Sequence, residues 1–154
     1  MTRALRTLII TALMPLGCDA DAAKCVEDIR AQVLSDRATL RIGPIDVDAE
    51  IAHTQTERER GWRYRRCDRE ALVMLSEPGT SVPIWGCDLV DPIDVIYVRA
   101  NEVLEVFADV APCPACDASC PQVGADLLVD AVIEVPSGTL HVEPGQLVTD
   151  IPTR

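Results

Sequence analysis

Seven cysteines constrain this chain more than any other feature, because six of them follow its first 22 residues. The first is Cys18, and the other six are Cys25, Cys67, Cys87, Cys113, Cys116 and Cys120. An even set of cysteines in a small exported chain predicts disulfides, since thiols pair and stay paired in oxidising compartments. Three bonds among six cysteines allow about 15 connectivities, and the sequence does not choose among them.

Residues 1–22 have the pattern of an export signal. Two arginines precede an apolar run over 8–16, which is shorter than the roughly 20 residues that span a bilayer and suits a signal-peptide core. A small-x-small site at 20–22 would release a soluble chain. The Leu-Gly-Cys ending at Cys18 instead resembles a lipoprotein signal, and we favour this second ending. The expected location is periplasmic or the cell envelope, with membrane contact only through a lipid on Cys18.

Length and charge narrow the classes of partner. About 130 residues remain after the signal, which suits one domain with a single core. The net charge of −11 argues against nucleic acid and anionic membrane as partners. An aromatic content of 3% also removes the stacking platforms that single-stranded nucleic acid needs.

Hydrophobic periodicity predicts a mainly β chain. Apolar residues at helical spacing make residues 23–36 a tether or a short amphipathic helix. Alternation over 45–51 predicts a half-buried strand after the Gly-Pro turn at 43–44. Thr54 and Glu57 form a capping-box pattern that opens a short helix. Further strands are expected over 72–75, 82–85, 93–98, 103–110, 129–135 and 146–151. Residues 37–154 therefore form a single β-sandwich or barrel-like domain with one or two short helices.

A series of short motifs runs along residues 37–152. The matching positions are Thr54 and Glu57; Arg60, Gly61 and Arg65; Trp85, Pro92, Ile93 and Asp94; Glu134, Val135 and Gly138; and Gly145. In this order they resemble the domain of unknown function 192 family, in its cysteine-bearing branch. The resemblance implies a compact β-sandwich-like domain with little helix and no established activity. It also implies a bond between Cys113 and Cys120, which would leave Cys116 to bridge to Cys25, Cys67 or Cys87.

The loop Cys113-Pro-Ala-Cys116-Asp-Ala-Ser-Cys120 has three interpretations. A disulfide-stapled loop is the one we favour for an exported chain. Cys113 and Cys116 also have the spacing of an exchange-active dithiol. The same spacings can bind a metal, which His53 or His141 would have to approach through the fold. Neither a metal nor a cofactor is expected.

Six large or polar positions are the candidates for any pocket. They are Arg60, Arg65, Trp85, Asp88, Asp94 and Glu134. Asp94 and Glu134 could act as acid and base if they converged, but a carboxylate at the start of a strand more often caps backbone N–H groups. The sequence contains no Ser-His-Asp elbow, phosphate loop or dinucleotide fingerprint. We therefore expect a non-catalytic binding or accessory module for an envelope protein or a small molecule. The alternatives are a small carboxylate enzyme and a thiol redox or metal-binding protein.

Overall fold

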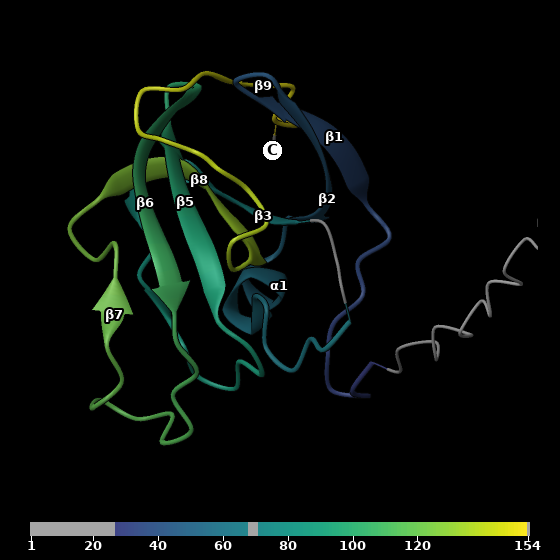
Figure 1. Cartoon of the computed structure of the whole chain (residues 1–154), viewed down its shortest axis with the longest axis vertical. Coiled ribbons are helices and arrows are strands. Elements are labelled where there is room, and N and C mark those ends of the chain that lie inside the picture. Colours follow the sequence, from purple (N-terminus) through teal and green to yellow (C-terminus); the bar gives the residue numbers. More distant parts are fainter. Residues whose placement is uncertain (1–26, 68–70, 154) are drawn as a thin grey trace, which may run out of the picture.

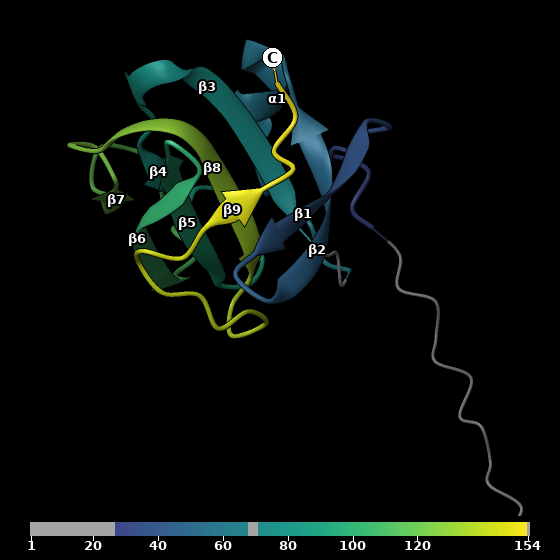
Figure 2. The ribbon, with the colours of Figure 1, turned by 90° about the horizontal axis from the view of Figure 1, so that it is seen from above.

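The computed structural model describes residues 27–67 and 71–153, and these form a curled sheet with a small second sheet beside it. The elements are β1 (Arg37–Ile42), β2 (Ile45–Ala52), α1 (Gln55–Arg60), β3 (Leu72–Ser81), β4 (Ile84–Trp85), β5 (Ile93–Arg99), β6 (Glu102–Val110), β7 (Gln122–Val123), β8 (Leu128–Pro136) and β9 (Val148–Thr149). The seven-stranded sheet has the order β6-β5-β8-β3-β2-β1-β9, and β4 pairs with β7. Seen from above in Figure 2, the large sheet curls into a half-barrel. The prediction of a mainly β barrel-like domain is confirmed.

Local sequence explains the first hairpin and the helix that follows it. Gly43 takes a φ of +55°, which glycine adopts at no steric cost, and it starts the turn between β1 and β2. Thr54 caps α1, because its Oγ1 accepts from the Glu57 N–H (3.2 Å) and Glu57 Oε2 accepts from the Thr54 N–H (2.8 Å). The predicted short helix is therefore confirmed. It lies within the connection between β2 and β3, which pair in parallel.

Both faces of the large sheet are covered, and each has its own core. Alternate residues of β3 show this: Val73 and Leu75 belong to one apolar cluster, whereas Leu72 and Met74 belong to the other. The second cluster includes Trp62, which follows α1. These alternating assignments follow from the two-residue period of a strand.

The second sheet is tied to the large one by a tyrosine. The hydroxyl of Tyr97, on β5, lies 3.0 Å from the carbonyl oxygen of Val82 and 2.9 Å from that of Val123. These carbonyls lie just before β4 and within β7. Gly124 makes the contact possible, because a Cβ there would lie 2.0 Å from the Tyr97 ring. This buried side chain therefore helps to hold β4 and β7 against the large sheet.

The structure corrects two local predictions. The described part of the predicted 23–36 helix, residues 27–36, is not helical, and Ile29 and Val33 are exposed. Gln32 instead holds the segment against α1, because its Nε2 donates to the Glu57 and Gly61 carbonyls, each at 2.9 Å. The expected break at 78–79 is instead a register shift within β3, where a proline without an N–H is tolerated.

The export signal lies outside the described residues, as do Cys18 and Cys25. None of the helices in the described ranges has the length and apolar character needed to cross a membrane.

Candidate functional site

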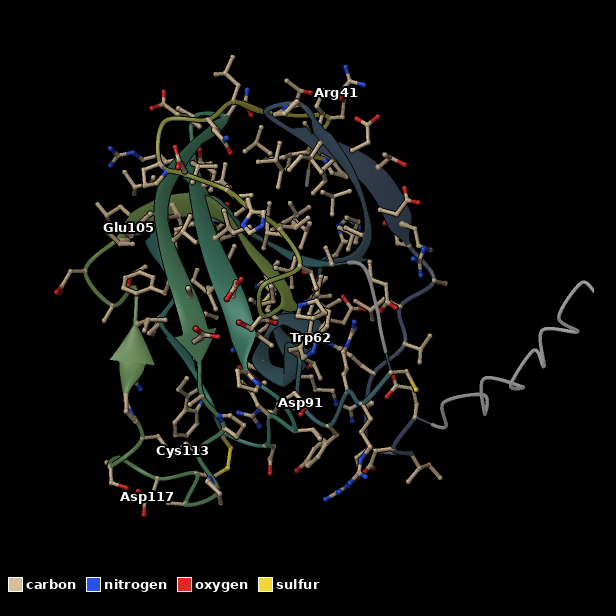
Figure 3. The ribbon with its side chains drawn as sticks, in the orientation of Figure 1. Arg41, Trp62, Asp91, Glu105, Cys113 and Asp117 are labelled. Carbon is tan, nitrogen blue, oxygen red and sulfur yellow. A yellow bond between two sulfur atoms is a disulfide. The ribbon has the colours of Figure 1, made fainter. Side chains whose placement is uncertain are left out.

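A cavity of about 690 Å³ lies between α1, the turn after it, the outer part of β3 and β4. Its walls come from the segments 55–63 and 76–85, together with Leu89 and Glu134. Trp62, labelled in Figure 3, lies beside α1 on this side of the molecule. The volume is within the range of about 300–1,000 Å³ that is typical of small-molecule sites.

Glu134 forms the buried end of this cavity. It lies in β8 opposite Leu72 of β3 and Val95 of β5, and only 3% of it is exposed. Gly61, which ends α1, makes room for the carboxyl group. A Cβ on Gly61 would lie 3.2 Å from Glu134 Oε2 and 3.4 Å from Oε1. Because Gly61 also has a φ of +49°, a larger residue there would be strained as well as crowded.

The Glu134 carboxyl group holds its proton unusually well. Burial raises its pKa from 4.5 to about 7, although Arg65, a backbone hydrogen bond from Trp62, and Arg63 act in the opposite direction. Oε2 has no hydrogen-bond partner within the described residues. A buried polar atom without a partner is costly, so this oxygen is available to a donor that enters the cavity.

Arg65 is a buried residue that packs against Trp62, which lines the cavity. Its side chain is fully buried, and its Nη2 lies 2.8 Å from Oε2 of the buried Glu50 on β2. Its guanidinium group lies 4.9 Å from the centroid of the Trp62 ring, within cation–π range. Arg65 therefore contacts the cavity residue Trp62 but does not itself line the cavity.

Arg60 and Trp85, two of the candidate residues, line the cavity. Arg60 ends α1, and Trp85 ends the short strand β4. The guanidinium group of Arg63 lies 5.9 Å from the centre of the Trp85 ring. The turn after α1 and the strand β4 therefore contact each other through the Arg63 guanidinium group and the Trp85 ring.

Asp88 lies outside the cavity lining. Its backbone carbonyl accepts from the Tyr64 N–H (2.8 Å). A side-chain hydrogen bond to Asp88 raises the pKa of the Tyr64 phenol. Both residues have positive φ, +58° for Asp88 and +63° for Tyr64. Asp88 therefore holds the turn after α1 against the loop after β4.

Asp94 is also outside the cavity, on the opposite face of the sheet from Glu134. Asp94 pairs with Val135 and Glu134 pairs with Val95, and these two valines belong to different apolar clusters. The Asp94 carboxylate accepts from the backbone N–H groups of Asp109 and Gly138, each at 2.9 Å. The hypothesis of a paired acid and base is therefore wrong, and Asp94 has the capping role considered beside it.

The cysteines of the loop are all in disulfides. Cys113 is bonded to Cys120, the pair that the resemblance implies, and Cys116 is bonded to Cys87. Cys67 is disulfide-bonded too. Cys87, Asp88 and Cys116 lie close enough together to suggest a metal site, but the two thiols are consumed by their bond. The Cys-x-x-Cys pair is not a dithiol unit here, and the bonds indicate an oxidising environment.

Sequence reasoning missed three residues of this site. Trp62 and Arg63 lie between the matched positions Gly61 and Arg65 and are not themselves part of the resemblance. Both line the cavity, and each contacts another site residue. Gly61 was named only as a position that matches the family. The sequence signal that could have indicated this site is the run Arg60-Gly61-Trp62-Arg63, in which a tryptophan and two arginines surround one glycine.

Removing the charge of Glu134 should change how stability depends on pH. A carboxyl whose pKa is raised by folding favours the folded state below its unfolded pKa, and this stability is lost as pH rises through the folded value. A rise from 4.5 to about 7 corresponds to about 3 kcal/mol. Glu134→Gln should therefore be more stable than the wild type at pH 8 by up to about 3 kcal/mol, and similar to it at pH 4. Urea unfolding at both pH values measures this, and equal stabilities at pH 8 would contradict it.

Comparisons with known proteins agree with this architecture. No curated protein matches the chain. A protein of unknown function from Novosphingobium aromaticivorans DSM 12444 has 23% sequence identity and a TM-score of 0.59, covering 73% of this chain and 84% of its own. A "putative transcription regulator" from Sinorhizobium meliloti 1021 has 20% identity and a TM-score of 0.65, covering 76% and 95%. Both likenesses concern the fold. A sequence model of the DUF192 family, described as "Uncharacterized ACR", matches residues 38–149, and the chain belongs to this family.

Proposed function

We propose that this protein is an exported binding module whose cavity takes a small polar ligand. The observation that carries the proposal is Glu134 Oε2, which is buried at the end of the cavity without a hydrogen-bond donor from the described residues. A ligand hydroxyl or amine would supply that donor. Pockets with a mixed apolar wall and a few convergent polar groups are typical small-molecule sites.

The disulfides support the export part of the proposal. Bonds such as Cys87–Cys116 are typical of proteins outside the cytoplasm, which fits an export signal over residues 1–22 and a lipid anchor at Cys18. The net charge of −11 favours a small molecule over DNA, although one protein of similar fold is titled a regulator of transcription.

The binding function can be tested with one acceptor-deleting variant. The oxidised chain is screened by thermal shift against neutral, acidic and basic metabolites, and the hits are measured by calorimetry. Glu134→Met keeps a similar volume but removes the acceptor. It should weaken the hits by about 10–100-fold, which corresponds to about 1–3 kcal/mol for a lost buried hydrogen bond. Glu105→Met, at an exposed position of β6 that Figure 3 labels, is the matched control. Hits that bind Glu134→Met as tightly as the wild type would contradict the proposal.

A second candidate function is acid–base catalysis by Glu134 alone. One observation favours it: a carboxyl with a pKa of about 7 can give and take a proton at neutral pH. The same screen tests it, if each hit is incubated with the protein and followed by NMR. Turnover that Glu134→Gln abolishes would establish an enzyme, whereas hits recovered unchanged would leave the binding module.

A further inference from the structure

Two arginines of the cavity form no ion pair within the described residues, although Arg63 is near enough to Glu134 to lower the pKa of that carboxyl group. Arg60 and Arg63 both line it, and within residues 27–67 and 71–153 neither forms an ion pair. Arg58, in contrast, donates from Nη1 to the His53 carbonyl (2.6 Å). The chain carries 25 acidic residues against 14 basic ones. Guanidinium groups that form no ion pair among the described residues, in a protein with so many acidic residues, are suited to an anionic ligand.

The buried end of the same cavity requires a hydrogen-bond donor, whereas the arginines require an anionic group. Glu134 Oε2 accepts and has no donor among the described residues. A ligand that satisfies both ends has a hydroxyl group at one side and an anionic group at the other. The arginines come from the end of α1 and the turn after it, whereas Glu134 comes from β8. The two recognitions are therefore made by separate elements and can be tested separately.

The cavity wall also suits a ring that presents C–H groups on one face. Trp85 is half-buried in this wall, and Ile84 and Leu89 line it too. Aromatic rings present a large, rigid apolar face at low entropic cost. Ser76, Thr80 and Ser81 add hydroxyl groups on the β3 side. A ring with hydroxyl groups on its edge and C–H groups on its face would contact both kinds of surface.

We propose that the ligand is an acidic sugar, with its carboxylate at Arg60 and Arg63 and a ring hydroxyl donating to Glu134. This rests on the binding function proposed above. A single carboxylate fits better than a phosphate ester, because Glu59 and Glu77 line the same cavity and repel each further negative charge. The sugar acid is either free or a uronic-acid unit of a polysaccharide.

The test compares matched sugars and matched variants. Glucuronate, galacturonate, glucose, glucosamine and trigalacturonate are titrated into the oxidised full chain by calorimetry and NMR. The variants are Arg60→Gln, Arg63→Gln and Glu134→Met, with Arg99→Gln as control for an exposed arginine outside the cavity. The uronates should bind at least about tenfold more tightly than glucose, and either cavity arginine variant should lose about tenfold for uronates only. Tighter trigalacturonate binding identifies a polysaccharide as the source, and equal or tighter monosaccharide binding identifies a free sugar acid.

The possible failures are distinguishable from one another. Equal binding of glucose and uronates, or arginine variants without effect, overturns the acidic-sugar proposal. If Glu134→Met still abolishes binding of another ligand in that case, the binding function stands. Tighter binding of glucosamine than of the uronates overturns the proposal as well, because the site would then select an ammonium group over a carboxylate. No binding of either uronate at millimolar concentration also overturns it. Thermal unfolding confirms that each variant is folded before it is titrated.

Discussion

Replacing Arg65 with methionine is expected to lower the free energy of unfolding by about 3–5 kcal/mol, the usual cost of breaking a buried ion pair from one side. Glu50 is only 2% exposed, and its carboxylate lies 2.8 Å from the Arg65 guanidinium group. The variant removes this guanidinium group and leaves the carboxylate buried. It also removes the cation beside the Trp62 ring. Urea unfolding at pH 7, with the disulfides intact, measures the change.

Two further variants distinguish the contribution of the Arg65–Glu50 ion pair to stability from a general effect of removing an arginine. Arg41→Met removes an exposed partner, since both side chains of the Arg41–Asp46 pair are more than half exposed. It should cost less than about 1 kcal/mol. Glu50→Leu combined with Arg65→Met should recover part of the loss, because the buried carboxylate that has lost its Arg65 partner is then removed as well. A loss of less than 1 kcal/mol for Arg65→Met alone would show that the pair does not hold this part of the fold.

The strands and the helix were predictable because their signals are local. Alternation along β2 follows from the two-residue period of a strand with one face against a core. The capping box of α1 is made by residues three apart, so Thr54 and Glu57 predicted it without tertiary information. The lead segment 27–36 differs, because Gln32 is bound by the backbone of α1. Contacts with a distant element there override apolar spacing that favours a helix.

The site was only partly predictable, because the faces of the buried strands cannot be read from the sequence. Residues 131–135 are all buried, as are 93–98, since both faces of the sheet are covered. A continuous buried run gives no alternation to assign faces. Asp94 and Glu134 therefore looked equally suited to a shared pocket. Only the register between β5 and β8 shows that their side chains lie on opposite faces.

The disulfides could be predicted as a set but not as a complete pattern. The resemblance implied Cys113–Cys120, and the partner of Cys116 was open among three cysteines. Cys87 takes this place because the loop returns to its backbone. The Cys113 N–H donates to the Gly86 carbonyl (2.7 Å), and the backbones of Cys87 and Cys113 pair as an isolated parallel β-bridge. Figure 3 places Cys113 and Asp117 in this loop, at the lower end of the molecule. Such closeness is a product of the fold and has no local signal.

Removing the Cys87–Cys116 bond should destabilise the protein more than removing Cys113–Cys120. The first closes a loop with a sequence separation of 29 and the second one of 7. Loop-closure entropy then gives about 3.5 kcal/mol for Cys87→Ala/Cys116→Ala and about 2.5 kcal/mol for Cys113→Ala/Cys120→Ala. Urea unfolding of the two double variants measures the difference.

The same two variants should also differ at the cavity, which is what makes their comparison informative. Cys87 lies two residues after Trp85, so its bond holds the end of β4 and the aromatic wall of the cavity. Cys113→Ala/Cys120→Ala leaves that bond in place and serves as the matched control. We expect the fluorescence of the Trp85 environment to change, and ligand affinity to fall, only in Cys87→Ala/Cys116→Ala. Equal losses of stability together with unchanged tryptophan fluorescence in both variants would show that the cavity wall is held by the Tyr97 hydroxyl and the β4–β7 pairing alone.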